Sequence, residues 1–143
     1  MRRHLRTLAV ATTLVLGGCG GAAGTSPFPS TAAATSSPRP SSTAKLSIIT
    51  PATGDVLPAG DITLKVNLTG ATIVAVTSTT LAPNRGHLHV ILDNQLVSMT
   101  SGTTTTLPGV GPGTHLLKVE FVASDHAPFD PRVIAATSFT VKG

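Results

Sequence analysis

Alternation of apolar and polar residues is the feature that most constrains how this chain can fold. In the segment 61–68 (DITLKVNL), an apolar residue occupies every second position and polar residues lie between them. The segment 115–123 (HLLKVEFVA) repeats the pattern, with Phe121 among its inward-facing residues. A period of two residues is that of a β-strand with one buried face. No amphipathic helical period appears among residues 45–143, so this region is predicted to be all-β.

Further segments of the same kind are expected as strands, namely 45–50, 71–79, 87–92, 95–99, 103–107 and 137–143. Asp93 and Asn94 separate two of them and fit a two-residue hairpin turn, because both residue types tolerate a positive φ. Short strands divided by turn residues every ~10 positions are typical of β-sandwiches. The prediction for residues 45–143 is an antiparallel immunoglobulin-like β-sandwich of about seven strands.

The N-terminus has the pattern of an export signal that ends at the only cysteine of the chain. A basic stretch at positions 2–6 precedes an apolar run at 8–16, which is shorter than the ~20 residues that span a bilayer. The following LGGC, positions 16–19, resembles the lipobox of bacterial lipoproteins, in which the peptide is cut before a cysteine that carries the lipid. We therefore expect a lipoprotein signal peptide at 1–18 and lipidation of Cys19. An ordinary signal peptide with an incidental cysteine is the alternative.

This N-terminal pattern predicts where the protein resides. The chain should be exported and anchored by its lipid to a bacterial cell membrane, with the folded domain on the extracytoplasmic side. Residues 19–44 comprise the cysteine and a segment rich in Ser, Thr, Pro and Ala. Such a composition cannot bury enough apolar surface to offset its ordering entropy, so a disordered linker is expected there.

Net charge argues against one class of partner. The chain has a formal charge of +4, but three of its ten basic residues lie within the first six positions. Residues 45–143 carry six basic and six acidic side chains, so the predicted domain is neutral. Nucleic-acid binding depends on a basic surface and is therefore not expected.

Two histidines one residue apart are the main candidates for chemistry. His87 and His89 share one face of the segment GHLHVIL, and the alternate residues form the core face. Neutral imidazoles at this spacing suit Cu or Zn. The candidate metal ligands are His87, His89, His115 and His126, which are all the histidines of the predicted domain. The alternative is that these side chains are solvated or hold loop carbonyls by hydrogen bonds.

Met99 would strengthen a copper site if it lay beside these histidines. A regular hairpin with its turn at Asp93 and Asn94 pairs Leu88 with Met99, which puts the thioether on the core face. That register argues against a histidine–methionine copper site. A slip of one residue would reverse the conclusion.

Several stretches resemble a family of small bacterial envelope lipoproteins with an immunoglobulin-like domain of unknown function. They are PATGDVLPAGDITLKVNLTG (51–70), NRGHLHVILDN (84–94) and LPGVGPGTHLLKVEFVASDHAPFDP (107–131). The resemblance implies that the four histidines belong to a recurring pattern, and it implies no reaction.

Two functions are compatible with these observations. The first is a lipid-anchored binding or structural module of the cell envelope, whose one identified partner is the membrane. The alternative is an envelope copper- or zinc-binding protein that uses the histidines. No enzyme is expected, because there is no phosphate loop, nucleophile elbow or paired carboxylates. No cofactor other than such a metal is indicated.

Overall fold

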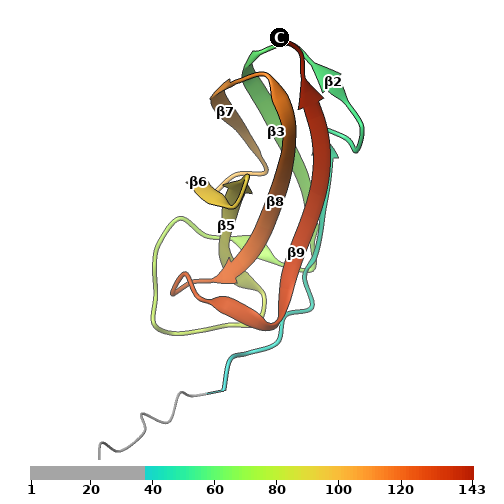
Figure 1. Cartoon of the computed structure of the whole chain (residues 1–143). Coiled ribbons are helices and arrows are strands. Elements are labelled where there is room, and N and C mark those ends of the chain that lie inside the picture. Colours follow the sequence, from blue (N-terminus) through green and yellow to red (C-terminus); the bar gives the residue numbers. More distant parts are fainter. Residues whose placement is uncertain (1–37) are drawn as a thin grey trace, which may run out of the picture. The chain divides into compact units, whose positions relative to one another are not determined.

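Nine strands and no helix make up residues 38–143, the part of the chain that this computed structural model describes (Figure 1). The strands are β1 (Lys45–Thr50), β2 (Val56–Leu57), β3 (Gly60–Thr69), β4 (Thr72–Ile73), β5 (Arg85–Leu92), β6 (Gln95–Thr100), β7 (Thr104–Val110), β8 (Gly113–Ala123) and β9 (Pro128–Val141). The all-β prediction is confirmed. No membrane-spanning helix is found between residues 38 and 143. The predicted signal peptide, Cys19 and most of the predicted linker lie outside the described residues.

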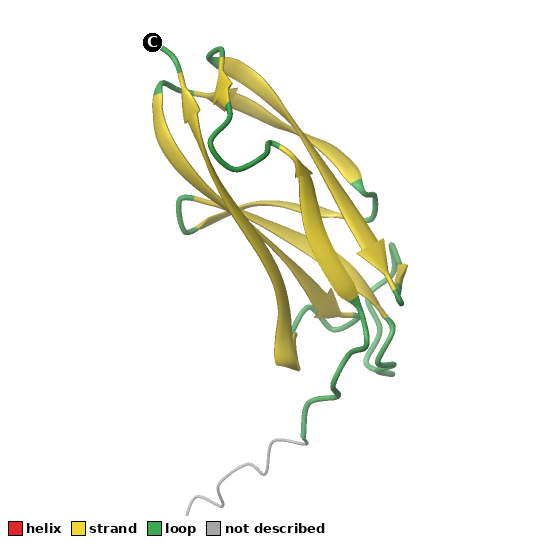
Figure 2. Ribbon diagram, turned by 90° about the vertical axis from the view of Figure 1, so that its right-hand side faces the viewer, coloured by secondary structure: helices red, strands yellow, loops and turns green. Residues whose placement is uncertain are grey.

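Two sheets pack face to face, as Figure 2 shows from the side. The smaller sheet has the order β1-β3-β7, and the larger has β2-β9-β8-β5-β4, with β6 also paired to β5. The long strands pair antiparallel, and only the two-residue strands β2 and β4 pair parallel. The predicted antiparallel sandwich is therefore the observed architecture, with seven longer strands and two short ones at the edges.

The core lies between the sheets and is built from the alternating residues. From β3 it receives Ile62, Leu64 and Val66, each 4% exposed or less. From β8 it receives a row of three fully buried side chains that ends at Phe121, whose ring stacks on that of Phe129 at 5.3 Å between centroids. The alternation read from the sequence thus identified the inner faces of these strands correctly, because each strand has one face against the opposite sheet.

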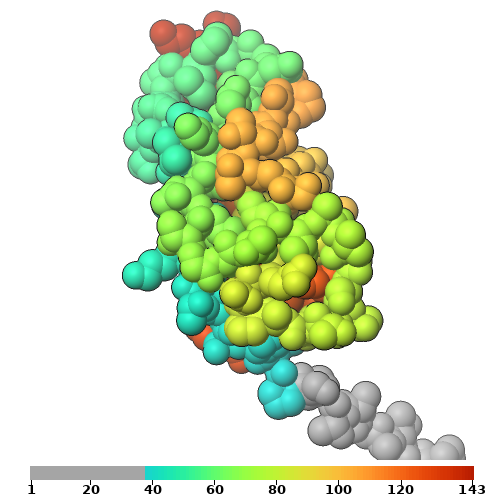
Figure 3. All heavy atoms as spheres, turned by 180° about the vertical axis from the view of Figure 1, so that it is seen from behind, coloured from blue at the N-terminus to red at the C-terminus, as the bar shows by residue number. Residues whose placement is uncertain are grey.

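The segment 71–79 was expected to be a strand, and this is wrong beyond its first residues. Only Thr72 and Ile73 pair with β5, after which the chain leaves the sheet edge. The Val74 amide still donates to the Gly86 carbonyl at 2.8 Å, and the Ser78 amide donates to the Ser124 carbonyl at 3.0 Å. These bonds hold the segment across the end of β5 and β8, where it forms a broad part of the surface in yellow-green (Figure 3). Hydrogen bonds to the backbone of Gly86 and Ser124 therefore outweigh the strand preference of its β-branched residues.

The predicted register of the β5–β6 hairpin is wrong in the part that matters for function. Asp93 and Asn94 do form the turn, with φ of 49° and 67°, and Leu92 pairs with Gln95. An extra residue in β6, Val97, then shifts the pairing by one position. His89 consequently lies opposite Met99. A residue inserted into one strand moves every later side chain to the other face, so the thioether joins the outer face instead of the core.

Residues that the sequence assigned to the linker contact the sandwich. The Arg39 guanidinium forms two hydrogen bonds to the Asp125 carboxylate, at 2.6 and 2.9 Å. Arg39 also donates to the carbonyls of Ala127 and Pro128. The Asp130 amide donates to the Pro40 carbonyl at 3.0 Å. The chain therefore enters the domain at the turn between β8 and β9.

Candidate functional site

Three of the four candidate histidines meet at one end of the larger sheet. Nε2 of His89 lies 3.2 Å from Nδ1 of His126. The rings of His87 and His126 stack with centroids 4.3 Å apart and planes 10° from parallel. This trio, His87, His89 and His126, is called the histidine cluster below. It combines two alternate positions of β5 with one residue from the turn between β8 and β9.

The fold places each member of the cluster for a local reason. His87 and His89 lie on the outer face of β5, because Leu88 and Val90 face the core and are at most 1% exposed. His126 lies in the β8–β9 turn and has a φ of 64°. Its amide donates to the Ala123 carbonyl at 2.9 Å, which closes the turn and directs the imidazole over β5.

His87 is held by the backbone and is only 5% exposed. Its Nδ1 lies 2.6 Å from the Val74 carbonyl oxygen, and its Nε2 lies 3.3 Å from that of Ser124. Carbonyl oxygens only accept hydrogen bonds, so whichever ring nitrogen carries a proton donates to one of them. His87 therefore fixes the segment at Val74 and supports the ring of His126 by stacking. The sequence had offered this role, hydrogen bonding to loop carbonyls, as the alternative to metal ligation.

The other two histidines direct nitrogen atoms toward each other. Nε2 of His126 is 2.9 Å from the Thr77 hydroxyl, which leaves Nδ1 to face His89. Partial burial lowers the pKa of His89, and the neighbouring His126 lowers it further. His89 is therefore a neutral imidazole at neutral pH, which is the form that can bind a metal.

Met99 lies beside this pair, on the face where the sequence did not place it. It is directly opposite His89 and 60% of its surface is exposed. A cavity of about 140 Å³ is lined by His87, Met99 and His126 together with Ala75, Thr100 and Ser101. Sequence reasoning considered Met99 but placed it on the core face, because the β-bulge that turns it outward leaves no mark in the alternation pattern.

The carboxylates near the cluster are already engaged. Glu120 lies opposite His89 on β8, but its two oxygens accept hydrogen bonds from Nε and a terminal nitrogen of Arg132. Asp125 is paired with Arg39, and this hydrogen bond holds the pKa of the carboxyl down at about 2. Among residues 38–143, no three His, Cys, Asp or Glu side chains are grouped so that they could hold a metal ion. A ligand set here must include another type of donor.

His115 does not join the cluster. It lies near the start of β8 on the face that turns toward the core, where its ring lies 5.4 Å from that of Phe139. Its Nδ1 is 2.7 Å from an Asp93 carboxylate oxygen and its Nε2 is 2.9 Å from the Gly111 carbonyl. The hydrogen bond to Asp93 raises the pKa of His115 and lowers that of Asp93. This histidine ties two turns together at the other end of β5.

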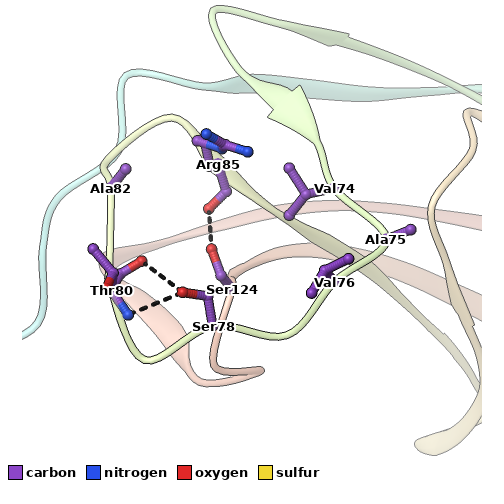
Figure 4. Close-up of a pocket in the computed structure, with 8 residues that line it drawn as sticks. All are labelled: Val74, Ala75, Val76, Ser78, Thr80, Ala82, Arg85 and Ser124. Carbon is purple, nitrogen blue, oxygen red and sulfur yellow. Dashed lines mark hydrogen bonds between the residues drawn. The ribbon is translucent and has the colours of Figure 1, made fainter.

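A second hollow is larger, at about 510 Å³, and its lining includes Val74 and Ser124, whose carbonyls contact His87. Figure 4 shows its lining residues, which are Val74, Ala75, Val76, Ser78, Thr80, Ala82, Arg85 and Ser124. The Ser124 hydroxyl donates to the Arg85 carbonyl, and the Ser78 hydroxyl bonds the backbone of Thr80. Ala75 lines both hollows, so a single segment, 74–84, bounds the two.

Comparison with known proteins identifies the fold. No family model matches the chain, and no curated protein matches it in sequence. Among solved structures, the fibronectin(III)-like modules of Clostridium thermocellum CbhA are similar, with a TM-score of 0.51 and 23% identity over 68% of this chain and 94% of that one. The PKD domain of human KIAA0319 matches with a TM-score of 0.38 and 22% identity, over 77% of this chain and 90% of that one. The chain therefore has an immunoglobulin-like β-sandwich fold.

Proposed function

We propose that this chain is a lipid-anchored protein of the bacterial cell envelope and that its sandwich acts as a binding module outside the membrane. The observation that carries the proposal is the sequence LGGC at 16–19, which follows a basic stretch and a short apolar run. The spacer-like composition of residues 20–44 and the sandwich fold suit a domain displayed at a membrane surface. The two carboxylates near the histidine cluster, Asp125 and Glu120, are each engaged in an ion pair. This also suits a binding role without catalysis.

Membrane association of a Cys19→Ala variant tests the anchoring directly. The unaltered chain should fractionate with membranes, enter the detergent phase and incorporate labelled palmitate. The variant should lose the label and most of the membrane association, because it lacks the cysteine to which the anchoring acyl chains are attached. Ser26→Ala, in the same polar segment, is the control and should behave like the unaltered chain. A Cys19→Ala chain that still carries the label would contradict the proposal.

The histidine cluster favours a second candidate function, the binding of copper or zinc in the envelope. The 3.2 Å between Nε2 of His89 and Nδ1 of His126 is the supporting observation. With metal–nitrogen bonds of about 2.0–2.1 Å, two nitrogens at that distance subtend about 100° at a shared metal, close to a tetrahedral angle. Titration of the full chain with Zn(II) and Cu(II), beside a His89→Ala/His126→Ala variant, tests this. Equal, weak binding by the two proteins would exclude it.

A further inference from the structure

We propose that Met99 completes this site and that the site, with His89 and His126 as its nitrogen ligands, is selective for Cu(I). The inference rests on the second candidate function and specifies its ligand. It follows from where the β-bulge places the thioether, from which donor atoms near the cluster are free, and from how the two imidazoles are held.

The bulge at Val97 brings a third donor to the imidazole pair. Directly opposed residues on neighbouring strands share a face and have Cβ atoms about 4.5–5.5 Å apart. Met99 stands in this relation to His89. It also shares the lining of the 140 Å³ cavity with His126. Its unbranched side chain has three rotatable bonds, so the sulfur can reach a metal held between the two rings. A methionine with 60% of its surface exposed contributes little to the core, and ligation gives this one a role.

The free donors at the site favour a soft monovalent metal. Thioether sulfur selects Cu(I), whereas imidazole accepts both copper and zinc. Zn(II) and harder cations would draw on carboxylates, but Glu120 is held by Arg132 and Asp125 by Arg39. The donors left are two imidazoles and one thioether, a set of three that suits Cu(I).

The surrounding contacts already hold one imidazole in a ligating orientation. The Thr77 hydroxyl can accept the Nε2 proton of His126, which directs the lone pair of Nδ1 toward His89. His87 stacks on the same ring and is itself fixed by two carbonyls. Binding then requires a change of tautomer at His89, in which its single ring proton moves from Nε2 to Nδ1 and leaves the lone pair of Nε2 for the metal. Metal-ligating histidines commonly have their second nitrogen fixed in this way.

Competition against a Cu(I) chelator tests the inference. The experiment uses the full chain in detergent and in a Cys19→Ser background, which removes the only cysteine as a competing soft ligand. Anaerobic titration with bicinchoninate gives the Cu(I) affinity, and a zinc chromophore gives the Zn(II) affinity of the same samples. The variants are Met99→Leu, which conserves side-chain volume, Thr77→Val and His126→Ala. His115→Gln removes a histidine outside the cluster and serves as the control, and circular dichroism verifies the fold of each variant.

We expect Met99→Leu to weaken Cu(I) binding at least tenfold while Zn(II) affinity changes less than about twofold. Thr77→Val should cost about 10–100-fold, and His126→Ala should cost at least as much, since a ligand contributes more than the group that orients it. His115→Gln should bind like the parent. If His126→Ala weakens binding but Met99→Leu does not, the inference falls while metal binding by the histidines survives. If no variant differs from the parent for either metal, both fall.

Discussion

Truncating Phe121 to alanine should remove much of the stability of the domain. Phe121 is fully buried on the inner face of β8, between Leu88 of β5 and Val133 of β9. Its ring also stacks on Phe129. Loss of a buried Phe costs about 3–5 kcal/mol, and an aromatic pair adds about 0.5–1.5 kcal/mol to its burial. We therefore expect a loss of about 4 kcal/mol in the free energy of unfolding.

This loss is large for a domain of this size, whose total stability falls in the range of about 5–15 kcal/mol. At about 4–8 °C per kcal/mol, the melting temperature should fall by about 15–30 °C. The chain has no Trp or Tyr, so unfolding in urea is best followed by circular dichroism or calorimetry. Leu116→Ala is the matched control, because Leu116 lies on the same strand but on its outer face and is 43% exposed. It should cost less than about 1 kcal/mol.

Two results would refute this reasoning. A loss below about 1.5 kcal/mol in Phe121→Ala would show that the ring does not fill the interior as described. A loss in Leu116→Ala equal to that in Phe121→Ala would show that the inner and outer faces of β8 are wrongly assigned.

Three further perturbations test other parts of the structure. Gly86→Ala should cost about 3 kcal/mol or more in unfolding free energy, measured in urea, because a Cβ there would lie 1.8 Å from a backbone carbonyl oxygen of β8. The stability difference between the parent and His115→Gln should be largest at about pH 4–6.5. The raised pKa of His115 makes its contribution fade as pH rises above that window, and the lowered pKa of Asp93 makes its contribution fade as pH falls below it. A pH-independent difference would count against this ion pair. Arg39→Ala should return the carboxyl pKa of Asp125 from about 2 toward 3.8, as read by NMR titration, and an unchanged pKa would contradict the role given to the Arg39–Asp125 hydrogen bonds.

The inner faces of the strands could be read from the sequence because one physical rule controls them. Side chains alternate along a strand, and a strand on one side of a two-layer sandwich buries one of its two faces. In 61–68 the apolar positions are the buried or half-buried ones, and in 115–123 the alternating residues Leu117, Val119 and Phe121 are fully buried. The turn at Asp93 and Asn94 was readable for a similar reason, since few residue types tolerate positive φ.

The composition of the site could not be read in the same way. The bulge at Val97 depends on the pairing of β6 with β5, and no residue type in β6 predicts it. The approach of His126 to His89 depends on a turn 37 positions away along the chain. Local patterns predict neither. One part was within reach of the sequence, since counting along β8 puts His115 on the face of Leu117 and Phe121, away from the outer face that holds His89.

Strand β9 shows a different limit. The segment from Pro128 to Pro131 has the composition of a loop, yet it begins a strand that continues to Val141. Phe129 is fully buried in this segment, and its burial beside Phe121 holds the chain against β8 despite the prolines. Apolar burial therefore decided the conformation of a stretch that turn residues would leave irregular.

X-ray absorption at the copper edge of the Cu(I)-loaded full chain, in the Cys19→Ser background, tests the metal site most directly. The spectrum should show two nitrogen scatterers and one sulfur scatterer in the inner coordination shell, and the sulfur should disappear in Met99→Leu. Without the cysteine, methionine is the one remaining source of sulfur in the sequence. A shell of nitrogen and oxygen alone in the parent, or a sulfur scatterer that persists in Met99→Leu, would contradict the site described here.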